Sequence, residues 1–156
     1  MCGDSLEHPL RSGDAIPRSA RAALWLGDAA AVHADLVILD ASGIHGQAVD
    51  TDRATIRVGI AALEGRSAEA LAGYRDILRA WRDLGLAWDE ALCGLDMALL
   101  LDPADPDVRA AADSSRETFV RLGAVPFIER LDATLATPPA SDIRGATADQ
   151  FEVNRS

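Results

Sequence analysis

Histidine and aspartate side chains in the first third of the chain are the residue types best suited to bind a metal. His33 lies near Asp28 and Asp35, and His45 follows twelve residues later. Imidazole and carboxylate groups are common ligands of zinc and iron. These histidines, however, lack the spacing of three or four residues that places two ligands on one helical face. The spacing favours a surface His33 and a loop His45. A small helical metal-binding protein or enzyme stays open as an alternative of another class.

A second set of acidic residues has spacing that resembles a calcium-binding loop. Asp102, Asp105 and Asp107 alternate with other residues, but Pro103 and Pro106 interrupt the series, and neither the glycine nor the final glutamate of such a loop follows. Helix capping explains these aspartates better.

Other catalytic arrangements find little support. All fifteen basic residues are arginine, which excludes a Walker-type phosphate loop and a Schiff-base lysine. No Gly-x-Ser-x-Gly elbow occurs. The pair Asp89 and Glu90 begins an expected helix, where carboxylates interact favourably with the helix dipole. We therefore expect no enzymatic activity, no catalytic residue, no metal and no cofactor.

Length and charge limit the remaining classes. A chain of 156 residues with 49% hydrophobic content is expected to form one domain. Its net charge of −10 repels nucleic-acid phosphates and anionic lipid, so neither nucleic acid nor membrane is an expected partner. Cys2 and Cys93 are far apart, and the opening residues resemble no signal peptide. These features favour a reducing cytoplasm.

Apolar residues recur at steps of three and four along most of the chain, which predicts helices and no strand. Residues 1–16 and 137–156 lack this period and are expected to be a flexible N-terminal segment and a disordered tail. Residues 17–136 are expected to form one helical domain. The seven expected helices cover residues 18–26, 28–41, 50–64, 67–84, 87–102, 105–122 and a last stretch from 126 onward.

Glycines end several of these helices at a regular interval. Gly27 and Gly65 are 38 residues apart, and so are Gly85 and Gly123. A glycine just past a helix takes the left-handed conformation that closes the last turn. A period of this length is typical of stacked helical hairpins, so the sequence predicts an all-α solenoid.

The two best-defined helices have clear start signals and apolar faces. Ser67 is the expected N-cap of the first, and Asp105 with Pro106 begins the second. Trp81 and Trp88 flank the turn between hairpins, where core packing is a better explanation than ligand stacking. The expected core faces contain Ala70, Leu71, Tyr74, Ile77, Leu78, Trp81 and Leu84 in the first helix, and Val108, Ala111, Ala112, Ser115, Phe119 and Leu122 in the second.

The segment from Gly65 to Ile77 resembles the second half of a tetratricopeptide repeat. It follows the pattern Gly-x4-Ala-x3-Tyr-x2-Ile, with Ala70 and Tyr74 at the small and aromatic positions. The resemblance implies tetratricopeptide-like hairpins, a fold that binds proteins or peptides.

Longer stretches are similar to the C-terminal repeat region of large bacterial signalling proteins that carry a nucleotide-cyclase domain and an ATPase domain. They cover residues 63–70, 81–88, 95–98, 106–112 and 121–131. This resemblance implies a repeat scaffold only, since the cyclase aspartates and the phosphate loop are not in this sequence. It leaves open a detached regulatory or dimerisation tail, whose exposed first hairpin favours self-association.

The tetratricopeptide register also predicts a concave binding surface. This surface is small and acidic and suits a basic or neutral peptide, whereas the missing lysines argue against gripping an acidic chain end. The favoured function is a non-catalytic protein–protein interaction scaffold. The predicted surface is lined by Asp52, Thr55 and Gly59 from one helix and by Asp89, Leu92 and Asp96 from a later one.

Overall fold

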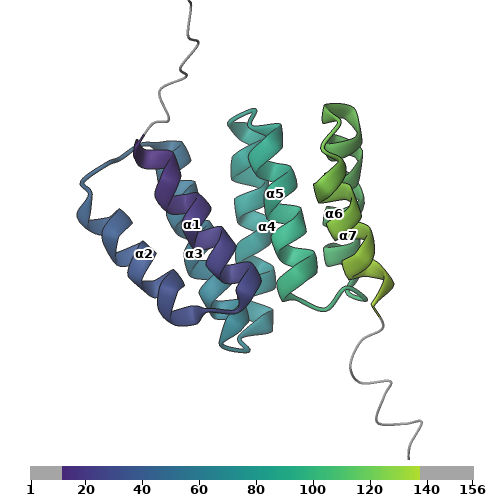
Figure 1. Cartoon of the computed structure of the whole chain (residues 1–156), viewed down its shortest axis with the longest axis horizontal. Coiled ribbons are helices and arrows are strands. Elements are labelled where there is room, and N and C mark those ends of the chain that lie inside the picture. Colours follow the sequence, from purple (N-terminus) through teal and green to yellow (C-terminus); the bar gives the residue numbers. More distant parts are fainter. Residues whose placement is uncertain (1–11, 138–156) are drawn as a thin grey trace, which may run out of the picture. The chain divides into compact units, whose positions relative to one another are not determined.

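The computed structural model describes residues 12–137, which form seven α-helices and no strand (Figure 1). The predicted all-α class and number of helices are confirmed for this part of the chain. The expectations for residues 1–11 and 138–156 lie outside the described residues. The helices are α1 (Ser12–Leu26), α2 (Ala29–Ala41), α3 (Gln47–Leu63), α4 (Ser67–Asp83), α5 (Ala87–Leu100), α6 (Pro106–Leu122) and α7 (Val125–Ala136).

Length alone favours one domain, but the contacts between residues divide the chain into two compact units. One lies within Met1–Ala80 and the other within Trp81–Ser156, so the division falls inside α4. In the first unit α1, α2 and α3 pack on one another, and in the second α5, α6 and α7 do. Antiparallel helices joined by short turns are the repeating element of both units.

Four helices end as the sequence predicts. Gly27, Gly65, Gly85 and Gly123 all have φ between 68° and 81°. Each glycine N–H donates to the carbonyl three residues back, as Gly27 does to Leu24. The N–H of the following residue donates to the carbonyl five residues back, as Asp28 does to Ala23. This repeated pair of hydrogen bonds is the Schellman motif, and glycine adopts its left-handed backbone without strain.

Some helix starts agree with prediction and others differ, as at α3, which begins at Gln47 rather than at residue 50. The Asp28 carboxylate accepts from Ala31 N–H at 3.0 Å, and Asp105 caps α6 ahead of Pro106. At α4 the first helical hydrogen bond runs from Ala70 N–H to Arg66 O, so Arg66 occupies the cap position expected for Ser67. The helix expected from residue 18 begins at Ser12 and contains Pro17, although an interior proline has no N–H to donate and its ring crowds the carbonyl four residues back.

Helix-interior glycines, which the sequence did not single out for packing, lie where neighbouring helices come close. A β-carbon at Gly73 in α4 would lie 2.5 Å from Val58 of α3. A β-carbon at Gly94 in α5 would lie 2.8 Å from the carbonyl oxygen of Ala111 in α6 and would overlap the Ser115 hydroxyl. Both crossings therefore require glycine.

The predicted core is largely correct. Ala70, Tyr74, Ile77 and Trp81 are buried on α4, and the buried residues of α6 are Val108, Ala112, Ser115 and Phe119. Two predictions are wrong. Leu122 is 53% exposed because α6 ends there, and Trp88 is 38% exposed because only part of its ring packs against other residues.

Candidate functional site

The first predicted binding triplet lies on the side of α3 that faces α1. Thr55 is buried and donates its hydroxyl proton to Thr51 O at 2.8 Å. Gly59 is also buried, and a β-carbon there would lie 2.6 Å from Leu24 of α1. Of the three, only Asp52 is partly exposed. Helix α1 therefore covers much of the surface that the register predicted to be open.

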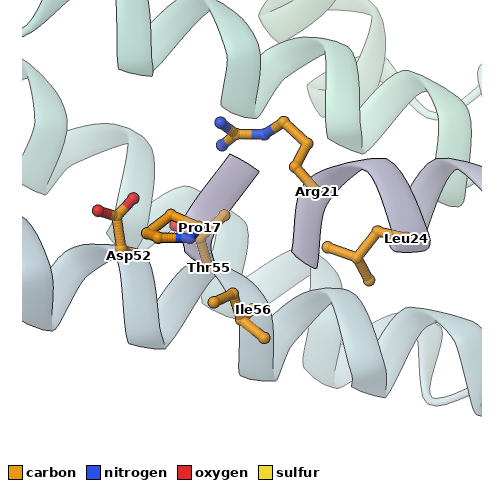
Figure 2. A pocket seen from close by; sticks show the side chains of 6 residues that line it. All are labelled: Pro17, Arg21, Leu24, Asp52, Thr55 and Ile56. Atoms are coloured by element: carbon orange, nitrogen blue, oxygen red, sulfur yellow. The ribbon is translucent and has the colours of Figure 1, made fainter. Parts of the chain in front are cut away.

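A shallow pocket remains beside this triplet, between α1 and α3 (Figure 2). Its cavity volume is about 10 Å³, which is about the space that one water molecule needs. The side chains of Arg21 and Asp52 point to the same side of it (Figure 2). The pocket is therefore far smaller than the sites that bind small molecules or peptides, roughly 300 Å³ or more. Its lining residues are Pro17, Arg21, Leu24, Asp52, Thr55 and Ile56.

The second predicted triplet belongs to α5 and the other compact unit. Leu92 and Asp96 are buried, and Asp96 has no exposed surface. Asp89 is partly exposed in the first turn of α5. Contact of a peptide with Leu92 or Asp96 would thus require the surrounding helices to open.

The residues considered for chemistry have local structural roles. His33 Nδ1 lies 2.8 Å from Ala29 O, one helical turn back, and His45 is exposed in the loop after α2. Asp102 accepts from Ala104 N–H at 2.9 Å, while Asp105 accepts from two N–H groups of α6. Among residues 12–137, no group of three or more histidine, cysteine, aspartate or glutamate side chains is placed to hold a metal ion.

Glu90, the neighbour of Asp89, forms a charged contact across the turn between α4 and α5. Arg82 donates to Glu90 Oε1 from both Nη2, at 2.6 Å, and Nε, at 3.1 Å. The pair joins the end of one helix to the start of the next. Glu90 therefore has a role in the turn that needs no acid–base chemistry.

Helix α2 carries exposed apolar residues on the surface of the first unit. It is apolar on nearly all sides, although a helix of this kind is normally buried all round. Val32 and Leu39 point into the unit, while Val37 is 67% exposed and Ile38 is also exposed. We call the outward residues Ala30, Ala34, Val37, Ile38 and Ala41 the α2 face.

Arg53 of α3 holds the C-terminal end of α2, the helix that carries this face. Its guanidinium is buried and donates to Leu39 O at 3.0 Å and to Ile44 O at 2.6 Å. It also pairs with Asp40 at 3.2 Å and with Asp50 at 2.8 Å. One side chain thus attaches α2, the following loop and α3 to one another. Sequence reasoning missed it, because nothing local to Arg53 marks it as buried.

The second unit contains an aromatic cluster formed by Trp88, Phe119 and Phe127. Trp88 meets Phe119 and Phe127 edge-on, with ring centroids 5.6 and 5.2 Å apart, and the two phenylalanines stack at 5.3 Å. Such pairs stabilise beyond the area they bury. The cluster joins α5, α6 and α7.

An ion pair adds to the junction of α6 and α7. Arg116 Nε donates to Asp132 Oδ1 at 2.9 Å, and Nη2 donates to Oδ2 at 3.2 Å. This two-point contact lowers the pKa of Asp132 below its ordinary value and raises that of Arg116. The pair is exposed, so it contributes modestly.

Comparison of the chain with protein-family models, with curated proteins and with solved structures finds no match. Among the described residues, no helix has the length and apolar character needed to cross a membrane.

Proposed function

We propose that the protein is a non-catalytic protein-interaction scaffold built of tetratricopeptide-like hairpins. The observation that carries the proposal is the α2 face, where Val37 and Ile38 are exposed on a helix that is apolar nearly all round. Contiguous apolar surface of this kind is typical of protein-binding sites.

The proposed contact surface differs from the groove expected from the tetratricopeptide register. Thr55, Gly59, Leu92 and Asp96 are buried, which leaves little of that groove for a partner. The α2 face needs no rearrangement, and a rigid preformed surface lowers the entropic cost of binding. In this proposal the protein acts in the cytoplasm, and its partner is a protein rather than nucleic acid or membrane. The net charge of −10 supports that choice.

A second candidate function follows from the resemblance to the tails of cyclase and ATPase signalling proteins. In this case the chain is a separate regulatory module that acts on such a protein in trans. The exposed first hairpin favours it, because α2 would then be the surface that contacts the regulated protein.

Site-specific photo-crosslinking tests the proposed function. A photoreactive amino acid replaces Val37 in cells that naturally make the protein, and a matched variant carries it at Arg79, which is exposed on α4. We expect defined protein adducts from position 37 and none of them from position 79. Equal adducts from both positions, or none from position 37, would contradict the proposal. An adduct with a cyclase or ATPase would select the second candidate.

A further inference from the structure

We propose that the occupant of the α2 face is a second copy of this chain, packed antiparallel across a two-fold axis at the middle of α2. This inference rests on the proposed function and names the partner of the same surface. It is argued from the order of residues along α2, from the charges beside the face and from its size.

The outward residues of α2 form a continuous seam. Ala30, Ala34, Val37 and Ala41 are exposed and follow at steps of four, three and four. This is the heptad spacing by which one helix packs against another. In an antiparallel pair centred between residues 35 and 36, Ala34 meets Val37 of the partner copy, and Ala30 meets its Ala41. A small residue thus faces a larger one at the centre, and two small residues meet at each end.

Exposed apolar side chains also flank α2 in the sequence, at the end of α1 and in the loop that follows α2. Leu26 is 82% exposed just before the helix, and Ile44 is exposed just after it. They lie at nearly equal sequence distances from the proposed axis, so Leu26 of one copy would approach Ile44 of the other. A two-fold interface requires this self-complementarity, because the same patch serves both copies.

Charges beside the seam are also complementary. His33 and Asp40 lie on the same flank of α2, seven residues apart. In an antiparallel pair equivalent flanks meet, so His33 of each copy would approach Asp40 of the other. The same flank therefore brings an imidazole and a carboxylate together at two symmetric points.

Two arginines reduce the repulsion expected between acidic chains. Asp40 is held by Arg53 at 3.2 Å and by Arg57 at 3.1 Å. Although the chain carries a net charge of −10, the Asp40 carboxylate is thus paired within its own unit. The α2 face itself consists only of alanine, valine and isoleucine, so a second acidic copy meets no carboxylate within it.

The size of the face predicts a weak dimer. Helix α2 has 13 residues, and a standard interface uses about 20 to 30 residues on each side. We therefore expect a dissociation constant in the micromolar range or above, on the order of 10 to 100 µM.

Light scattering after size-exclusion chromatography, over a concentration series of the full chain, tests this dimer. We expect a monomer to dimer transition for the unaltered protein. V37D should raise the dissociation constant about tenfold or more, since it buries an unpaired charge in the seam. V120D is the matched control, because Val120 is a similarly exposed helical valine in the other unit and its replacement should leave the dimer unchanged. Circular dichroism checks that both variants keep their helical content.

Cysteine crosslinking tests the antiparallel register. In a C2S background, which leaves buried Cys93, the double variant A30C/A41C reacts with a maleimide crosslinker. Its two positions are eleven residues apart in one helix, about 16 Å, and the crosslinker is chosen shorter than that. We expect a covalent dimer from the double variant and little from A30C or A41C alone. A covalent dimer from A30C alone would indicate parallel packing and overturn the proposed arrangement.

The possible outcomes separate this inference from the proposed function. A chain that stays monomeric up to about 1 mM, or a V37D variant that dimerises normally, overturns the self-association. Equal weakening by V37D and V120D overturns α2 as the specific seam. If the chain is monomeric but position 37 crosslinks to a different protein, the inference fails and the proposed function stands. If position 37 crosslinks to nothing, both fail.

Discussion

Arg53 and Asp40 form an ion pair between α3 and α2, with Nε of the arginine 3.2 Å from Oδ1 of the aspartate. The two side chains differ greatly in environment, since Arg53 is buried and Asp40 is exposed. Arg53 also donates to the carbonyl groups of Leu39 and Ile44. The arginine therefore holds the end of α2 and the following loop in place, and with them the α2 face.

Replacing Arg53 should loosen the end of α2. R53A removes the arginine donor from Ile44 O and one of the donors to Leu39 O, which still accepts from the Ser42 hydroxyl, and we expect a loss of about 1–3 kcal/mol. R53K keeps the charge but cannot reproduce the forked geometry, so its loss should be intermediate. Hydrogen exchange at the amides of α2 measures the effect within the first unit.

The control for this prediction is R57A, which removes the exposed arginine that binds the same aspartate. An exposed pair contributes about 0–1 kcal/mol, so exchange in α2 should change little. Equal effects of R53A and R57A would show that the buried carbonyl contacts do not hold α2.

Two helix-interior glycines should respond differently to the same added methyl group. At Gly94 the obstacle includes the backbone carbonyl of Ala111, whereas at Gly59 it is the end of the flexible Leu24 side chain. We expect G94A to cost about 1–3 kcal/mol and G59A clearly less. Urea unfolding of both variants measures the difference. A cost at Gly59 equal to that at Gly94 would mean that Leu24 cannot move aside.

The sequence predicted those features that are encoded by neighbouring residues. Gly123 and Asp105 mark the end and start of α6 through bonds that reach five residues or fewer, so the local pattern was sufficient. Features that join distant segments were missed. Arg53 bonds to residues up to 14 positions away, and Gly94 is explained only by the approach of α6.

The candidate site was less predictable than the fold for the same reason. Asp52, Thr55 and Gly59 lie on the side of α3 that faces α1, and whether that side is open depends on α1, which their spacing cannot show. For α2, periodicity is a poor predictor of which side faces the core, because apolar residues occupy nearly all sides of the helix. Its outward face is determined by the packing of α1 and α3 against the opposite side (Figure 1).

The Arg116 and Asp132 pair predicts a pH-dependent contribution to stability. Because the fold lowers the pKa of Asp132, its stabilisation is present above the unfolded pKa, about 3.9, and is lost as pH falls through the folded value. D132N should therefore lower the melting temperature at pH 7, and this difference from the unaltered protein should vanish in strong acid.

A double-mutant cycle with R116Q isolates this pair. If the arginine is the cause of the shifted pKa, D132N should have little further effect in the R116Q background. An undiminished effect of D132N without Arg116 would assign the stabilisation to another contact of Asp132.

Phe119 is the buried member of the aromatic cluster and should contribute most to it. F119A should cost about 3–5 kcal/mol through the cavity it leaves, while F119L keeps much of the volume and loses the ring contacts with Trp88 and Phe127. For F119L we expect a loss of about 1–2 kcal/mol and a weaker near-ultraviolet circular dichroism signal. The neighbouring V120A, at an exposed position, should stay within about 0.5 kcal/mol of the unaltered protein. Urea unfolding measures all three variants, and an F119L loss no larger than that of V120A would mean that ring geometry adds nothing to the packing of α5, α6 and α7.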